Sequence, residues 1–113
     1  MAHQNERFTS FVRKEIAQFL EAHVPRPEGA FVSVTKVLVN ESFDHARVFV
    51  TVFPETSRDE VMKELPRFEK EARAFIAGRL RRHKIPEIRF VFDAEYAAGL
   101  RLEKLLENIE DKE

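Results

Sequence analysis

The sequence predicts an α+β fold, a two-layer sandwich in which helices cover a three-stranded sheet. Its 113 residues suit one domain. Two segments rich in β-branched residues are joined by a short polar connection, which indicates an antiparallel hairpin. Helical spacing precedes, separates and follows the strands, and three strands are too few to close a barrel. We therefore expect a single domain, 1–113, with its core over residues 7–109 and frayed ends at 1–5 and 110–113.

The first half of the chain predicts one helix and two strands. Over residues 7–23, apolar side chains recur at steps of three and four, and Pro25 ends this helix. Residues 31–39 predict a strand whose alternation slips, so either both of its faces are partly covered or a bulge lies near Thr35 and Lys36. Residues 46–53 alternate cleanly between an apolar face and a face made of Arg47, Phe49, Thr51 and Phe53.

The second half returns to helical spacing over residues 57–83. Ser57 and Glu60 resemble a capping box, while Pro66 and Gly78 favour a broken or kinked pair of helices. A third strand is predicted at 87–93. The final helix, at 94–110, carries the apolar set Leu102, Leu105, Leu106 and Ile109.

The residue types argue against an enzyme. There is no cysteine, so disulfides, thiolate metal sites and cysteine nucleophiles are excluded. No serine lies in a Gly-x-Ser-x-Gly turn, the four histidines lack metal-ligand spacing, and no glycine-rich phosphate loop exists. We expect no catalytic residue, no metal and no cofactor. No apolar run approaches the roughly 18 residues of a membrane helix, so we expect a cytoplasmic protein.

Charge is distributed unevenly along the chain. Residues 73–89 hold six basic residues against Glu87 alone, a net charge of +5, whereas residues 93–113 sum to −4. Favourable placement of cations near a helix C-terminus accounts for two or three of the six. A local basic segment of this kind can also bind polyanions, and the acidic C-terminal segment could mask it in the free protein. Its basic residues are Arg73, Arg79, Arg81, Arg82, Lys84 and Arg89.

The polar and aromatic face of the second strand has two interpretations. Phe49 and Phe53, flanked by Arg47, could stack unpaired bases. Large apolar side chains are seldom left exposed, however, so we expect the C-terminal helix to cover both rings.

The predicted order, α-β-β-α-α-β, is that of the type II KH domain, but the three glycines cannot form the Gly-x-x-Gly loop with which such domains hold RNA. From about Arg7 to Ile109 the chain resembles a KH relative without that loop, the ribosome-binding factor A (RbfA) family. Ala74 and Ser42 stand where the family tends to have Gly and Asp. The resemblance depends on Val34-Thr35-Lys36-Val37, Ala46-Arg47-Val48-Phe49-Val50-Thr51, and Pro86-Glu87-Ile88-Arg89-Phe90-Val91-Phe92-Asp93 with Gly99-Leu100-Arg101-Leu102.

The resemblance implies a monomeric assembly factor that binds the immature 30S ribosomal subunit through 16S rRNA and assists its maturation. It implies a role in processing the 5′ end of 16S rRNA and in growth in the cold, with no membrane, cofactor or catalysis. Residues 73–89 would present the RNA-binding surface, helped by Arg7, Arg13, Lys14 and Lys36. The alternative is a protein–protein interaction module that uses the sheet face or the Phe-rich first helix.

Overall fold

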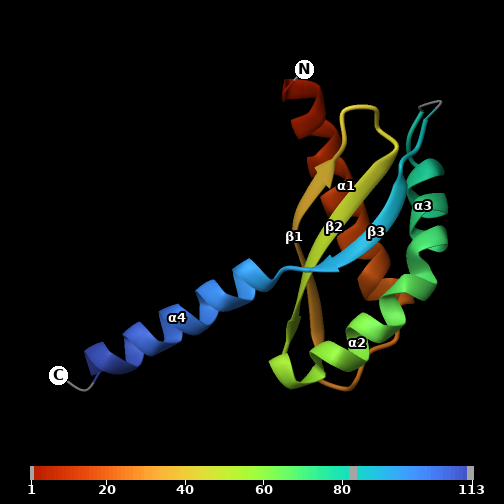
Figure 1. The fold of residues 1–113 in the computed structure, drawn as a ribbon. Coiled ribbons are helices and arrows are strands. Elements are labelled where there is room, and N and C mark those ends of the chain that lie inside the picture. The colour runs from red at the N-terminus through yellow and green to blue at the C-terminus, as the bar shows by residue number, and fades with distance from the viewer. Residues whose placement is uncertain (1, 82–83, 112–113) are drawn as a thin grey trace.

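The computed structural model describes residues 2–81 and 84–111, and the side chains of residues 6–81 and 84–109. Its element order confirms the predicted α+β class (Figure 1). The elements are α1 Ala2–His23, β1 Phe31–Val39, β2 His45–Phe53, the 3₁₀ helix η1 Glu55–Ser57, α2 Arg58–Glu64, the 3₁₀ helix η2 Leu65–Phe68, α3 Glu69–Ala77, β3 Glu87–Phe92 and α4 Ala94–Asp111.

The sheet has the strand order β1-β2-β3. β1 pairs with β2 in antiparallel fashion, which confirms the hairpin, and β2 pairs with β3 in parallel fashion through the crossover made by α2 and α3. The register of β1 shifts between Val34 and Lys36, so the bulge at Thr35 is confirmed. Because of this extra residue, Ser33 and Lys36 lie on the same face of the sheet although their numbers differ by three.

Helices α1 and α3 form the second layer and cover one face of the sheet (Figure 1). The even-numbered residues of β2 face them, and Val48 and Val50 are fully buried. Phe8 and Phe19 of α1 are buried in the same core, so the first helix does not offer these rings to a protein partner. The largest fully buried side chains contributed by the helices are Ile16, Leu20, Leu65 and Ile76.

The predicted break between the central helices lies at Pro66, inside η2. Ala72, Arg73 and Ala74 lie within α3, so there is no kink at the position where the family tends to have Gly, and Gly78 follows the last residue of α3. The prediction of a capping box at Ser57 and Glu60 is wrong. Ser57 has helical dihedrals and makes no side-chain cap hydrogen bond, because η1 runs directly into α2.

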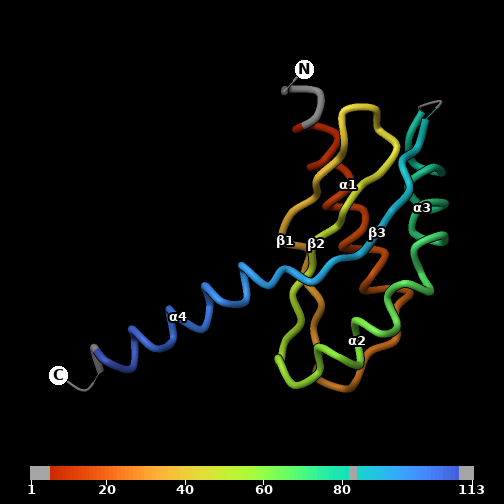
Figure 2. Tube along the Cα trace, viewed as in Figure 1, coloured from red at the N-terminus to blue at the C-terminus, as the bar shows by residue number. Residues whose placement is uncertain are grey.

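The expectation that the C-terminal helix covers Phe49 and Phe53 is also wrong. α4 leaves the end of β3 and points away from the sheet, and its apolar set is exposed (Figures 1 and 2). Phe49 is only partly buried, and Phe53 keeps 61% of its surface exposed. Asp93 anchors the first turn of α4, and Arg101 pairs with Glu55 of η1. Held in this way, the helix leaves the sheet face open (Figure 1). Among the described residues, no helix is long and apolar enough to cross a membrane.

Candidate nucleic-acid interface

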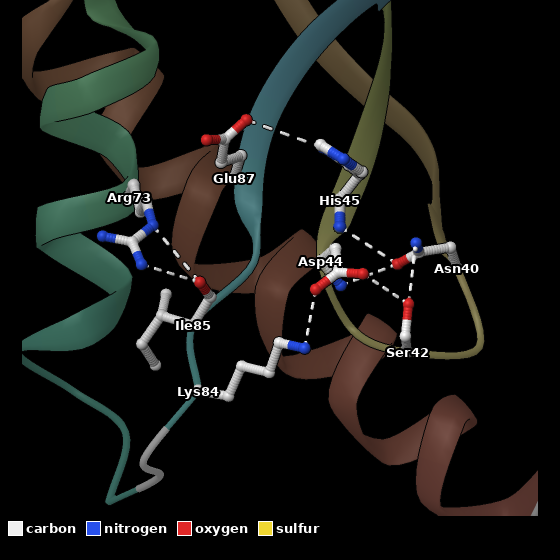
Figure 3. A network of polar contacts seen from close by, with 8 residues as sticks. All are labelled: Asn40, Ser42, Asp44, His45, Arg73, Lys84, Ile85 and Glu87. Carbon is white, nitrogen blue, oxygen red and sulfur yellow. Dashed lines mark hydrogen bonds and ion pairs between the residues drawn. The ribbon is translucent and has the colours of Figure 1, made fainter.

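The basic segment, residues 73–89, runs from α3 through a connection into β3, and Arg73 holds this connection in place. The Nε and Nη2 atoms of Arg73 donate to the carbonyl oxygen of Ile85, at 3.2 and 2.8 Å (Figure 3). A guanidinium group has five N–H donors in a planar fork, so Arg73 can hold Ile85 and still offer other donors to a ligand. Arg73 is exposed.

Lys84 is paired inside the molecule. Its Nζ lies 2.6 Å from Oδ1 of Asp44, in the turn between β1 and β2 (Figure 3). Ser42 donates its hydroxyl to the other oxygen of Asp44 at 2.5 Å, and the Asn40 side chain accepts the backbone N–H groups of Asp44 and His45. The hydrogen bonds from Lys84 and Ser42 hold the pKa of Asp44 below its usual value. A local carboxylate therefore already offsets the charge of Lys84.

Arg79 and Arg81 follow the end of α3. The Nε atom of Arg79 lies 3.3 Å from an oxygen of Glu15 on α1, and its guanidinium lies 4.2 Å from the centre of the Phe75 ring. Half of the Arg79 side chain remains exposed. Arg81 is exposed and has no ion pair with any residue that the structure describes, while Arg82 lies outside the described residues.

A groove of about 770 Å³ lies where α3 meets β2 and β3, and cations from all three elements line it. Arg47 and Arg89 are register partners on the two parallel strands, so their side chains leave the same face side by side. Two carboxylates also line the groove, and each has a partner within the molecule. Glu69 accepts the backbone N–H of Phe90 at 2.9 Å, and Oε2 of Glu87 lies 3.6 Å from Nδ1 of His45. The cations that line the groove are Arg47, Lys70, Arg73 and Arg89.

Lys70 is the groove cation that the sequence did not single out, and Arg47 was expected only on the polar face of the second strand. Lys70 and Arg73 are three residues apart in α3 and so share one helix face, a signal that the spacing could have provided. Arg47 reaches the groove because it is the register partner of Arg89 on β3, and the sequence alone does not give the register between these two strands.

The remaining predicted contacts lie elsewhere. Arg13 and Lys14 line a second hollow, of about 570 Å³, between α1 and β1, at the sheet edge opposite β3. Lys36 stands on the open sheet face, with Nζ 4.7 Å from the centre of the Phe49 ring. The structure thus brings Arg73 and Arg89 into one groove and leaves Arg13 and Lys14 at another edge. α4 points away from α3, so its described side chains do not mask the basic segment (Figure 1).

Comparison with known proteins identifies the family. The family model described as Ribosome-binding factor A matches residues 4–106. The chain belongs to the ribosome-binding factor A family. The RbfA of Halothermothrix orenii is 33% identical over 108 residues, which cover 95% of this chain and 88% of that protein. The RbfA of Shewanella loihica is 31% identical over 113 residues, 97% of this chain and 80% of that protein.

Solved RbfA structures share the fold. The crystal structure of RbfA from Thermus thermophilus superposes with a TM-score of 0.68, at 21% identity, over 78% of this chain and 93% of that one. A T. thermophilus RbfA homology model, fitted into the cryo-EM map of a 30S–RbfA complex, has a TM-score of 0.60 at 22% identity, over 73% and 87% of the two chains. The family is named for binding the ribosome and not for a reaction, so membership confirms the prediction of a non-enzymatic protein.

Proposed function

We propose that this chain binds the 30S ribosomal subunit through 16S rRNA and assists its maturation in the cytoplasm, including processing of the 5′ end of 16S rRNA and growth in the cold. The observation that carries the proposal is the RbfA family match over residues 4–106. The T. thermophilus RbfA homology model fitted into the cryo-EM map of a 30S–RbfA complex supports the identity of the partner.

The groove between α3 and the sheet is the surface that best suits an rRNA backbone. Guanidinium groups pair bidentately with phosphate, and Arg47, Arg73 and Arg89 are all exposed there. The chain has no Gly-x-x-Gly loop to hold single-stranded bases in the manner of other KH domains. Phosphate contacts therefore supply affinity in the groove, and the shape of folded rRNA supplies selectivity.

Sedimentation through a ribosome gradient tests the partner. A tagged chain should migrate with free 30S subunits and be absent from complete ribosomes, and the double variant K70E/R89E should stay at the top of the gradient. K63E/R67E is the matched control, because Lys63 and Arg67 are exposed cations outside the groove and their reversal changes the net charge by the same amount. A K70E/R89E variant with a native far-UV spectrum and unchanged co-migration would show that the groove is not the contact.

The maturation role needs a separate measurement. A strain that lacks this protein should accumulate 16S rRNA with an unprocessed 5′ end after a shift to low temperature, as primer extension would show. The wild-type chain should restore processing, whereas K70E/R89E should not. Normal 5′ ends in the deletion strain would remove the processing role and leave subunit binding to be judged by sedimentation.

A further inference from the structure

The sheet face opposite the helices is open, and it combines exposed aromatic rings with cations. Phe31 and Phe53 are register partners at one end of the hairpin, and each keeps 61% of its surface exposed. The bulge at Thr35 places Lys36 on this face, next to Phe49. The other residues that share this face by register are Ser33, Leu38, His45, Arg47, Thr51, Glu87, Arg89 and Val91.

We propose that this open face binds an unpaired stretch of RNA, whose bases stack on Phe31 and Phe53 while the cations of the face contact its backbone. The proposal rests on the proposed function and adds to it a second, single-stranded contact outside the groove. Bases stack on aromatic side chains regardless of sequence, because every base has a π-face. Phe49 is less available, since Lys36 and Arg47 already lie 4.7 and 5.6 Å from the centre of its ring.

The charge of the face selects a polyanion as the occupant. Lys36, Arg47 and Arg89 stand on it against two carboxylates of the described residues, Glu87 and Asp93, which gives a net charge of +1. The Asp93 carboxylate follows Val91 by two residues and is held by Thr35 of the bulge, close to Lys36. The cationic Nζ of Lys104, on α4, also lies 5.8 Å from the centre of the Phe53 ring. A protein partner could use the apolar rings, but it would have no general reason to match this excess of positive charge.

The face is continuous with the groove. Arg47 and Arg89 line the groove and also stand on the open face, so one RNA strand could pass from one surface to the other without a break. Along β2, the seven residues from Arg47 to Phe53 span about 20 Å. That length accommodates several nucleotides, with cations near Arg47 and the exposed rings of Phe31 and Phe53 at the other end.

The test compares two ligands that carry equal charge. Fluorescence anisotropy would measure binding of an oligouridylate of about ten nucleotides and of an abasic oligomer of the same length. The double variant F31L/F53L keeps apolar side chains but removes both rings. It should lose about tenfold in affinity for oligouridylate and leave abasic binding unchanged. L105A is the matched control, because Leu105 is equally exposed on α4, away from this face, and its loss should change neither affinity.

A second measurement needs no variant. On titration of the wild-type chain with oligouridylate, the amide resonances of Ser33 and Thr51 should shift, while those of Ala17 and Gln18 on α1 should stay in place. Equal wild-type affinity for the two oligomers, unchanged oligouridylate binding by F31L/F53L, or shifts confined to α1 would overturn the proposal.

The two proposals fail in different ways. If F31L/F53L migrates with 30S subunits and the wild-type chain binds both oligomers equally, base stacking is wrong and subunit binding stands. If F31L/F53L loses the subunit while its oligouridylate affinity is unchanged, the face docks a ribosomal protein and the RNA contact is wrong. If the wild-type chain binds oligouridylate through this face but never migrates with the subunit, the proposed function fails alone.

Discussion

Thr35 and Asp93 are 58 positions apart in the chain, and the Thr35 hydroxyl donates to Oδ2 of Asp93 at 2.6 Å. The same hydroxyl lies 3.3 Å from the carbonyl oxygen of Phe49. Oδ1 of Asp93 accepts the backbone N–H of Tyr96, so this carboxylate caps α4 while it is tied to the bulge of β1. The pair couples the bulge, which places Lys36 on the open face, to the direction in which α4 leaves that face.

Removing this pair should destabilise the fold in a non-additive way. Asp93 is 6% exposed, so D93A would leave the Tyr96 N–H without its acceptor and leave the Thr35 hydroxyl only the more distant Phe49 carbonyl. We expect D93A to lower the free energy of unfolding by about 2 kcal/mol. T35V should lower the free energy of unfolding by about 1 kcal/mol. The double variant T35V/D93A should lower it by less than the sum of the two single losses. Additive losses in urea titrations would show that the two side chains act independently.

The same carboxylate should make stability depend on pH in the acid range. The hydrogen bond from Thr35 lowers the pKa of Asp93 in the folded state, against the effect of burial, which raises it. The folded chain therefore holds the proton less tightly than the unfolded chain does. The contribution of the Asp93 carboxylate to the free energy of unfolding is complete above the pKa of an aspartate in the unfolded chain, about 3.9. This contribution is lost as the pH falls through the lower pKa of the folded state. Urea titrations between pH 7 and pH 2 should show this loss, and it should be smaller in D93N, which has no charge at this position.

The fold was predictable because local patterns decide most of it. The slip in alternation around Thr35 predicts the bulge, and Pro66 predicts the break between the central helices. The place of α4 was not predictable, because its apolar spacing indicates a helix but does not say what the helix packs against. Asp93 ties its first turn to a residue of β1, and Arg101 of α4 pairs with Glu55 of η1. No local pattern reveals such long-range contacts.

The candidate site was predictable in part, for the same reason. The charge of residues 73–89 is visible in the sequence, and Arg73 and Arg89 do share a groove. Pairing inside the molecule is not visible in the sequence. Lys84 is held by Asp44, and Arg79 lies beside Glu15 on α1, so two of the predicted contacts already have carboxylate partners. A count of cations along the chain overstates the charge that is free to bind RNA.

RNA binding through the groove should depend steeply on salt. Each phosphate contact releases counterions, so the logarithm of the binding constant should fall linearly with the logarithm of the salt concentration. R89E should reduce this slope by about 0.7–0.9, which corresponds to one lost phosphate contact. R13E should reduce it less, because Arg13 lies at the other edge of the sheet. Equal changes in slope for the two variants, measured with 30S subunits, would argue against a contact centred on the groove.

The exposed leucines of α4 should contribute little to the stability of the isolated chain. Leu102 and Leu105 keep more than half of their surface exposed. L102S/L105S should therefore change the free energy of unfolding by less than about 1 kcal/mol. L65A is the contrast, because Leu65 is fully buried in the core and its truncation should cost about 2–5 kcal/mol. A large loss of stability in the α4 variant, followed by circular dichroism during thermal unfolding, would mean that these leucines pack against the body.

Arg73 should stabilise the entry into β3 as well as line the groove. Its two hydrogen bonds to the Ile85 carbonyl fix the residues that precede Glu87, whose N–H donates to the Asp44 carbonyl at 2.8 Å. R73Q shortens the side chain and removes the planar fork, so we expect faster amide hydrogen exchange at Glu87 and a loss of about 1 kcal/mol in unfolding free energy. Arg67 provides the control, because its side chain lies near Glu64 on the surface and R67Q should leave both quantities unchanged. Faster exchange at Glu87 in both variants would indicate a general loss of stability, and unchanged exchange in R73Q would mean that the turn between β1 and β2 holds the strand without Arg73.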